Sequence, residues 1–387
     1  MEFLNNNVCS PKGFKALGKT VGIKKSGKAD LAVIFSEVLS DAAAVYTSNK
    51  VKGAPLIVTK KHLEDGKAQA IVVNSGIANV CTGEKGIKDA EEVAKLSAED
   101  LGINVNNVLV ASTGLIGAFL PMDKISKGLK GIKNELKISP DAAAAIMTTD
   151  KVKKEIAIKV DNFTIGAIAK GSGMISPNMA TMLCFITTDA KIPSKNLSAL
   201  LKNSVNKSFN MTTVDMDQST SDMAVIMANG LAGKVDEKKF QNALDYVCTE
   251  LAKKIAKDGE GATKLVEVHA KNAATEEDAK KIAKAVVSSN LVKCAIFGND
   301  PNVGRIMCAI GNSMAKFKEN LIDIYFGNEQ VVQNGRISVF NPNEIKSIMK
   351  KDALAITIDL NNGKENATAY GCDMTYDYIK INALYST

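Results

Sequence analysis

Short apolar runs recur along the first third of the chain, and amphipathic stretches separate them. Residues 31–35, 70–73 and 108–111 are rich in Val, Ile, Leu and Ala, which is typical of buried strands. Residues 90–101 and 124–136 instead place apolar side chains three or four positions apart among charged ones. That periodicity predicts amphipathic helices that alternate with the strands.

The alternation continues through the middle of the chain and beyond it. Residues 156–160 and 163–168 are strand-like runs separated by Asp161 and Asn162, and this spacing predicts a hairpin with a two-residue turn. Further helices are predicted at 195–209, 237–257, 276–287 and 343–349, and further strands at 222–228 and 264–268.

The last 70 residues are strand-rich, and Asn361, Asn362 and Gly363 predict another hairpin turn there. Strands and helices are mixed on both sides of residue 180, with no low-complexity linker between them. The pattern therefore predicts an α+β fold with mixed sheets, built from two halves that form one layered body.

One segment combines a strained turn with a buried strand. The run KGSGMISPNMATMLCFITTD, residues 170–189, passes from small, turn-prone residues directly into an apolar strand, and Thr181 lies at the junction. A threonine there could cut its own chain and become an N-terminal residue. Its hydroxyl would then have its own α-amine as an adjacent base, so the pattern indicates a candidate N-terminal nucleophile.

Composition narrows the classes of protein. The 387 residues include 45% hydrophobic and 24% charged residues, as in ordinary globular proteins, and no run of about 20 apolar residues predicts a membrane span. The N-terminus shows no signal-peptide pattern, and seven scattered cysteines without a C-x-x-C pair favour reduced thiols. A cytoplasmic protein without a membrane or metal site is therefore expected.

The charge pattern and the scarcity of histidine exclude further classes. The formal charge of +7 comes almost entirely from lysines that are interspersed with acids, and Trp is absent, so nucleic-acid binding is not expected. The two histidines, His62 and His269, lie in contexts that suggest an exposed position and a strand, respectively. Any catalytic base is therefore expected to be something other than imidazole.

Two further segments carry candidate chemistry, each with an ordinary structural alternative. Thr113 and Gly114 follow the strand at 108–111 and could present a hydroxyl and a backbone N–H to an oxyanion, although a simple strand-exit turn has the same pattern. Lys170 precedes the Gly-Ser-Gly turn and could pair with a substrate carboxylate or tune a nearby amine, although a surface lysine is equally compatible.

The acidic segments are also ambiguous. Residues 215–222 concentrate carboxylates and hydroxyls, for which a hydrogen-bonded loop is a better explanation than a metal site, because they contain no His and no EF-hand spacing. Glu260 lies between Gly259 and Gly261 after a long helix, where a solvated helix-cap residue is the simplest interpretation.

Taken together, ten ordered segments resemble the ornithine acetyltransferase (glutamate N-acetyltransferase) family, which includes the bifunctional arginine biosynthesis type. They are GFKALG, VKGAPLIV, NSGIANVCTG, ASTGLIG, AIMTTD, KGSGMISPNMATML, VDMDQSTSD, DGEGATK, FGNDPNVGRI and INALYST. The resemblance implies a four-layer α/β/β/α fold of the self-cleaving N-terminal-nucleophile type. It also implies transfer of acetyl from N2-acetyl-L-ornithine to L-glutamate in the cyclic arginine biosynthesis pathway.

The resemblance also implies a processed assembly. The bond between Ala180 and Thr181 would be cut, and the two pieces, 1–180 (α) and 181–387 (β), would form one intertwined body and a heterotetramer of two α and two β chains. Thr181 matches the nucleophile, and Thr113 and Gly114 match the oxyanion-stabilising pair. The resemblance assigns substrate contacts to Thr149, Lys170, Thr181, Glu260, Asn382 and Thr387, with Thr148 as the alternative to Thr149.

The sequence departs from the usual family pattern at a few positions, none of which removes a proposed catalytic group. Isoleucine replaces a typical Asn at Ile77, and the other departures are Lys151, Met216, Ser221 and Val303. They bear on the finer substrate preference rather than on the reaction.

Three alternatives remain open at this stage. The reaction needs neither a metal nor a cofactor, but acetyl-CoA could serve as a second acetyl donor. An N-terminal-nucleophile aminopeptidase or amidase, in which water replaces glutamate, would share the same nucleophile. A binding or scaffold protein with the same fold but no maturation is the remaining class.

Overall fold

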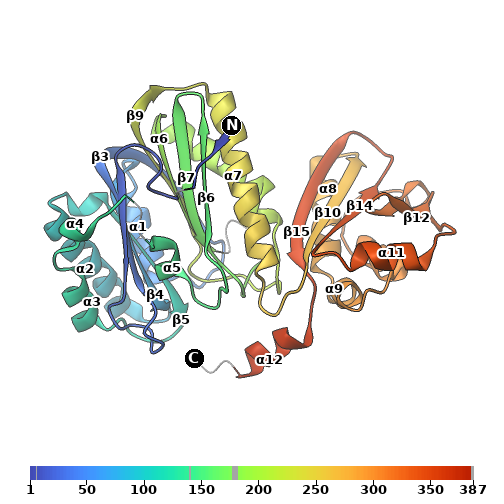
Figure 1. Cartoon of the computed structure of the whole chain (residues 1–387), viewed down its shortest axis with the longest axis horizontal. Coiled ribbons are helices and arrows are strands. Elements are labelled where there is room, and N and C mark those ends of the chain that lie inside the picture. The colour runs from blue at the N-terminus through green and yellow to red at the C-terminus, as the bar shows by residue number, and fades with distance from the viewer. Residues whose placement is uncertain (6, 139–140, 177–181, 385–387) are drawn as a thin grey trace. The chain divides into compact units, whose positions relative to one another are not determined.

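The computed structural model describes residues 1–5, 7–138, 141–176 and 182–384 (Figure 1). These residues form two compact units. Unit 1 comprises the described residues of 1–171, 177–206 and 218–251, and unit 2 comprises those of 172–176, 207–217 and 252–387. Each unit has its own sheet and its own hydrophobic core.

Unit 1 is built on a nine-stranded mixed sheet whose order is β1-β6-β7-β8-β9-β3-β4-β5, with β2 paired to β3. The strands are β1 (Glu2–Phe3), β2 (Phe14–Lys19), β3 (Leu31–Tyr46), β4 (Lys67–Ile77), β5 (Val108–Leu115), β6 (Lys154–Val160), β7 (Phe163–Lys170), β8 (Leu183–Lys191) and β9 (Met223–Lys234). The pairs β4–β5 and β8–β9 are parallel, and the other pairs are antiparallel.

The sheet of unit 1 folds into two arms that pack against each other. β3 belongs to both arms, since residues 31–35 and 40–41 pair with β4 and residues 41–46 pair with β9, with a register shift between Phe35 and Ser40. Alternate side chains of each strand point inward, and these include Ile34 and Ile71 from one arm and Phe185 and Val225 from the other, all in one buried cluster.

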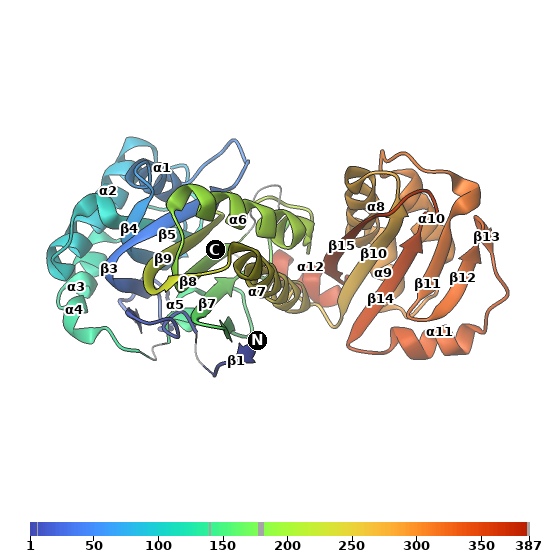
Figure 2. The same ribbon diagram turned by 90° about the horizontal axis from the view of Figure 1, so that it is seen from above.

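Helices cover the outer faces of both arms (Figure 2). The outer cluster on β3–β5 includes side chains of α1 (Ala54–His62), α2 (Gly83–Leu101), α3 (Met122–Leu129) and α4 (Ile132–Glu135). On the other arm, α6 (Ser194–Lys207) and α7 (Glu237–Lys257) bury apolar side chains, and Phe240 contacts Phe163 of β7 with ring centroids 5.5 Å apart. Unit 1 therefore confirms the expected α+β fold and its α/β/β/α layering. The short α5 (Ala142–Ile146) packs into the cluster between the arms.

Unit 2 holds a six-stranded mixed sheet in the order β13-β12-β11-β14-β10-β15. Its strands are β10 (Leu265–Ala273), β11 (Asp323–Phe326), β12 (Glu329–Gln333), β13 (Arg336–Ile337), β14 (Ala353–Asp359) and β15 (Glu365–Cys372). Its helices are α8 (Glu276–Ser288), α9 (Asn290–Phe297), α10 (Val303–Gly311), α11 (Pro342–Met349) and α12 (Tyr376–Leu384). Single 3-10 turns lie at Val105–Asn107 in unit 1 and at Phe209–Met211 and Glu319–Leu321 in unit 2.

The hairpin expected at residues 361–363 is wrong. The chain does turn there between β14 and β15, but β10 lies between these two strands, parallel to β14 and antiparallel to β15. Leu360 N–H donates to the Lys271 carbonyl and Asn362 N–H to the Asn272 carbonyl, so the turn residues pair with the end of β10. The residues of a turn do not show whether the two strands that they connect pair with each other or with a third strand that lies between them.

Two other local expectations need correction. The helix expected at 124–136 is broken into α3 and α4, with Gly131 at a φ of +78° between them. His62, which was expected to be exposed, is only 7% exposed, and its Nδ1 lies 2.8 Å from the Val108 carbonyl oxygen. As the last residue of α1 it faces the sheet, which its charged neighbours in the sequence conceal.

The boundary expected at residues 180/181 does not coincide with the boundary between the two units. β8, on the C-terminal side of residue 181, pairs with β7 from the N-terminal side along one edge and with β9 along the other. The division into α and β chains stays a prediction. No helix among the described residues is both long and apolar enough to cross a bilayer.

Candidate active site

The residues singled out from the sequence fall into three groups. Thr113, Gly114, Thr149 and Lys170 lie in unit 1, and Glu260 and Asn382 lie in unit 2. Ala180, Thr181 and Thr387 lie outside the described residues, so the expected nucleophile and cleavage site are known here only from the sequence.

Thr113 and Gly114 end β5, next to the end of β4. Thr113 is 8% exposed, and Gly114 is the register partner of Gly76 in the parallel β4–β5 pair. Gly114 has a φ of +128°, and a Cβ on it would lie 2.3 Å from the Gly76 carbonyl carbon. The two backbones approach so closely that only glycine fits at residue 114.

Lys170 reaches the Thr113 hydroxyl. It is the last residue of β7 and the register partner of Leu183, the first residue of β8. Its Nζ donates a hydrogen bond of 3.2 Å to Thr113 Oγ1. The structure thus brings together two candidate side chains that lie 57 residues apart in the sequence.

Asp150 links the loop after α5 to Gly171, the residue that follows Lys170. Sequence reasoning did not single out Asp150. Thr148 and Thr149 are both half-buried, and the backbone N–H of Thr148 donates 2.9 Å to Asp150 Oδ2. Lys154 Nζ and the N–H of Gly171 each donate 2.7 Å to Asp150 Oδ1. The choice between Thr148 and Thr149 as a substrate contact stays a prediction.

Asp150 remains ionised despite its burial. Burial alone would raise its pKa, but the positive charges of Lys170 and Lys154, together with its hydrogen bonds, lower the pKa to about 2. Lys24 adds a third cation nearby. Burial lowers the pKa of Lys24 to about 8, and Asp150 and Asp30 partly oppose this shift. The end of β7 therefore carries more positive than negative charge, which suits an anionic ligand.

In unit 2, Glu260 is only 8% exposed, so the interpretation of this residue as a solvated cap is wrong. Its N–H donates 2.9 Å to the Ser172 carbonyl, and its Oε2 accepts 2.9 Å from Asn382 Nδ2 of α12. A Cβ at Gly173 would lie 2.4 Å from Glu260 Cδ, so the carboxylate rests directly on the backbone of residue 173. Glu260 and Asn382, both predicted to bind substrate, are thus in contact.

The acidic loop at 215–222 is hydrogen-bonded, in line with the preferred interpretation. The carboxylate of Asp215 accepts from the N–H groups of Met174, Ile175 and Asp217 at 2.7–3.3 Å. Burial raises the pKa of Asp215, and these donors partly offset the shift. Within the described ranges, no three His, Cys, Asp or Glu side chains gather in a way that could hold a metal ion.

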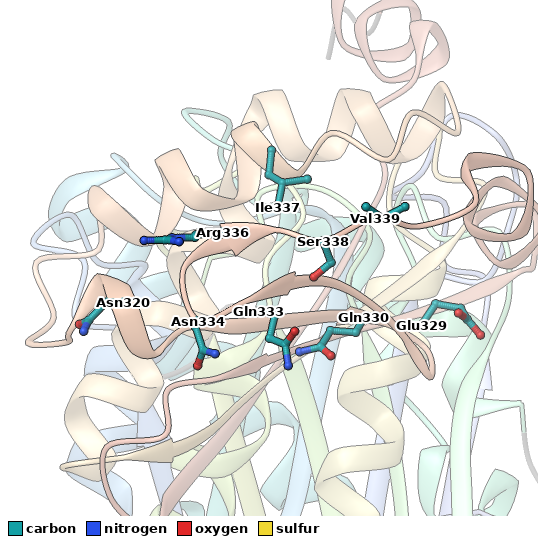
Figure 3. Close-up of a pocket in the computed structure, with 9 residues that line it drawn as sticks. All are labelled: Asn320, Glu329, Gln330, Gln333, Asn334, Arg336, Ile337, Ser338 and Val339. Atoms are coloured by element: carbon teal, nitrogen blue, oxygen red, sulfur yellow. The ribbon is translucent and has the colours of Figure 1, made fainter.

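The most voluminous of the concavities described, about 780 Å³, is formed by residues of unit 2 (Figure 3). It is lined mainly by polar side chains around β12 and β13: Asn320, Glu329, Gln330, Gln333, Asn334, Arg336, Ile337, Ser338 and Val339. It contains none of the predicted site residues. Volume is therefore a poor guide to the candidate active site of this chain.

Comparisons with known proteins show the family of the chain. The fold and the site define an α+β protein in which a hydroxyl of β5, a lysine of β7 and a buried carboxylate from the loop after α5 lie close together. The ArgJ family model matches residues 15–387, and the chain belongs to the ArgJ family. The prediction that it is an enzyme of the acyltransferase class is confirmed by this membership.

Its relatives match over the full length. The arginine biosynthesis bifunctional protein ArgJ of Caldanaerobacter subterraneus subsp. tengcongensis is 49% identical over 404 residues, and that of Listeria monocytogenes serotype 4b is 47% identical over 399, with 100% of both chains covered in each case. A crystal structure of the protein of that name from Bacillus halodurans is similar to this chain, with a TM-score of 0.50 and 42% identity. It covers 51% of this chain and 97% of that one.

Proposed function

We propose that this chain transfers the acetyl group of N2-acetyl-L-ornithine to L-glutamate, giving L-ornithine and N-acetyl-L-glutamate in arginine biosynthesis. The observation that carries this proposal is the family match over residues 15–387, which includes every proposed site residue. The contact between Lys170 and Thr113 supports it, because it joins two candidate groups at one end of the unit 1 sheet.

The reaction proceeds in two half-reactions. Thr181 Oγ attacks the acetyl carbonyl while the α-amine of Thr181 accepts the hydroxyl proton. The Thr113 hydroxyl and the Gly114 N–H stabilise the tetrahedral oxyanion, which collapses as the α-amine of ornithine takes the proton and leaves. The α-amine of glutamate then attacks the acetyl-threonine ester, and Thr181 Oγ recovers its proton.

The two substrates share an α-amino-acid headgroup, so one pocket serves both half-reactions. Lys170 and Glu260 supply opposite charges for the carboxylate and amine groups of the substrates, and Thr149, Asn382 and Thr387 supply further contacts. The contact of buried Glu260 with Asn382 supports this role, because it brings two of the proposed substrate contacts together.

The nucleophile arises by self-cleavage. Thr181 Oγ attacks the Ala180 carbonyl, the acyl group shifts from nitrogen to oxygen, and water hydrolyses the resulting ester. The α chain, 1–180, and the β chain, 181–387, then remain together, and two of each form a heterotetramer. The pairing of β8 with strands from both sides of residue 180 supports their association after the cut.

The cycle balances without a metal or a cofactor. Acetyl-CoA could replace acetylornithine as the donor, since any acyl compound that acetylates Thr181 would feed the same second half-reaction. That second donor would make the enzyme bifunctional, like the relatives whose names carry the word.

The decisive experiment is an assay of N-acetylornithine with glutamate, repeated with acetyl-CoA and glutamate and with acetylornithine in water alone. We expect acetylglutamate from the first mixture and a Thr181→Ala variant that is inactive and runs as one chain of 41.1 kDa on a denaturing gel. Hydrolysis without transfer would instead indicate an amidase. Two fragments from Thr181→Ala would refute the cleavage mechanism.

A further inference from the structure

We propose that Asp150 is a positioning residue that holds the loop of Thr148 and Thr149 at a fixed distance from the end of β7, and hence from Lys170. The proposal rests on the proposed function, in which both segments contact substrate. In the described part of the chain, the Asp150 carboxylate accepts hydrogen bonds from Thr148, Lys154 and Gly171, none of which is assigned to the chemical step.

The carboxylate bridges two backbone segments. Its Oδ2 accepts from the N–H of Thr148 at 2.9 Å, and its Oδ1 accepts from the N–H of Gly171 at 2.7 Å. Hydrogen bonds to a charged acceptor are among the stronger ones in proteins, and two on one rigid group fix both the distance and the direction between the segments. We refer to this arrangement as the Asp150 clamp.

Lys154 supplies a buried counter-charge to the clamp. Its Nζ lies 2.7 Å from Asp150 Oδ1, and both side chains have no exposed surface. Lys154 begins β6 and is the register partner of Ala169 in β7, directly before Lys170. The ion pair is therefore held by the same sheet that holds Lys170, so the clamp has a rigid support.

The clamp also joins the electrostatics of the site. Asp150 attracts Lys170, which in turn donates to Thr113 Oγ1, so the carboxylate restrains the ammonium group that reaches the expected oxyanion site. Because Lys170 and Lys154 hold the pKa of Asp150 far below neutrality, the clamp is ionised at neutral pH.

The test separates the clamp from the ion pair. Asp150→Asn keeps one acceptor oxygen, so at most one of the two backbone bridges survives, but it also leaves Lys154 buried without its counter-charge. The double variant Asp150→Asn/Lys154→Met removes that charge as well. Lys154→Met alone keeps the clamp and removes only its ion-pair partner.

The matched control is Asp141→Asn, which breaks the exposed pair of Asp141 with Lys153, 2.9 Å apart, in the same part of unit 1. Activity is normalised to the cleaved fraction on a denaturing gel, so that a defect in maturation is not mistaken for a defect in transfer.

We expect Asp150→Asn to lower the melting temperature and the double variant to recover most of it. In both, kcat/KM for N-acetylornithine should fall by about 10- to 100-fold, the range that corresponds to losing a hydrogen bond to a charged group. Lys154→Met should keep kcat/KM within a few-fold of the wild type, and Asp141→Asn should leave it unchanged. Wild-type kcat/KM in a stable double variant would overturn the proposal, as would an equal loss in Lys154→Met.

Hydrogen exchange gives a readout that does not depend on activity. The backbone amides of Thr148 and Gly171 should exchange faster in the double variant than in the wild type, whereas unchanged protection would overturn the clamp. If the wild type fails to transfer acetyl, the proposed function fails, but the exchange measurement still decides whether Asp150 holds the two segments.

Discussion

At the scale of single residues, the contact of Gly114 with Gly76 is a tight steric constraint beside the expected oxyanion site. A side chain on residue 114 would collide with a backbone carbonyl, which cannot move aside as the tip of a flexible side chain can. The backbone at residue 114 also has a positive φ, which disfavours any residue with a Cβ. The proposed oxyanion donor is therefore placed where no other residue is tolerated.

Gly114→Ala should consequently lose both stability and transfer activity. We expect a cost of about 1–2 kcal/mol from the left-handed φ, plus about 1–3 kcal/mol from overpacking. Gly117→Ala is the control, since Gly117 has a φ of +87° but no atom within 4 Å of its Cβ position. Urea unfolding measures both costs, and equal destabilisation of the two variants would contradict the collision.

Gly173 imposes a similar constraint on Glu260. Gly173→Ala should push the carboxylate away from Asn382, and if Glu260 binds substrate, KM should rise by about tenfold, as expected for one displaced hydrogen-bonding group. Gly304→Ala in α10 serves as the control, because a Cβ there would lie 3.6 Å from Asn302 Oδ1, an ordinary van der Waals distance. Steady-state kinetics would show the difference, and an unchanged KM would argue against a substrate contact by Glu260.

Sequence reasoning singled out Thr113, Lys170 and Glu260 because recognisable motifs contain them, and the structure adds their contacts. Sequence reasoning could not identify the buried ion pair of Asp150 and Lys154. Lys154 stands in the charged run KVKKE, residues 151–155, which is typical of a solvated surface, and nothing in that pattern distinguishes the one lysine whose side chain is fully buried. The Lys154 side chain is buried because β7 and the loop after α5 pack around it, and this packing depends on the tertiary structure.

At the scale of elements, the loop between β2 and β3 is organised around a buried aspartate. The carboxylate of Asp30 accepts from the N–H groups of Val21, Ile23 and Lys24 at 2.6–2.9 Å, and Asp30 has no exposed surface. Its carbonyl accepts from Ser75, next to Gly76, so this loop supports the end of β4.

Asp30→Asn should therefore destabilise the protein by about 2–3 kcal/mol, since an amide nitrogen would face donors that need an acceptor. Asp65→Asn changes an exposed turn in which Asp65 accepts from Lys67 N–H at 2.9 Å, and it should cost far less. Differential scanning calorimetry would compare the two, and similar melting temperatures would count against the role of Asp30.

Elements were easier to predict than their pairing. The helix at 237–257 and the hairpin around Asp161 and Asn162 match α7 and the β6–β7 turn, because helical periodicity and turn chemistry are local. The insertion of β10 between β14 and β15 and the length of β3, which extends to Tyr46, depend on strands distant in the sequence.

At the scale of the whole molecule, the response to acid is a sum of opposing contributions. Asp150 has a lowered pKa, so it stabilises the fold above about pH 4 and loses this contribution as the pH falls towards 2. Asp222 is buried, and burial raises its pKa, so its contribution is present at low pH and is lost as the pH rises through the folded pKa. The net slope alone therefore identifies neither group.

A comparison of variants isolates Asp150. Between pH 4 and pH 2, the free energy of unfolding of the wild type should fall by about 2 kcal/mol more than that of Asp150→Asn/Lys154→Met, from a pKa lowered from 3.8 to about 2. The Asp141→Asn variant should retain the wild-type slope. Urea titrations at several pH values provide the measurement, and parallel slopes for all three proteins would contradict the lowered pKa.

The position of β8 between β7 and β9 determines whether the two pieces of a mature molecule come from the same translated chain. Once the proposed scission precedes β8, this strand would still be hydrogen-bonded to a strand from each side of the cut. The pieces could not exchange with those of another molecule unless the sheet came apart. Each working copy would keep both halves of one translation product, and isotopically light and heavy populations mixed after maturation would yield no hybrids between α and β pieces.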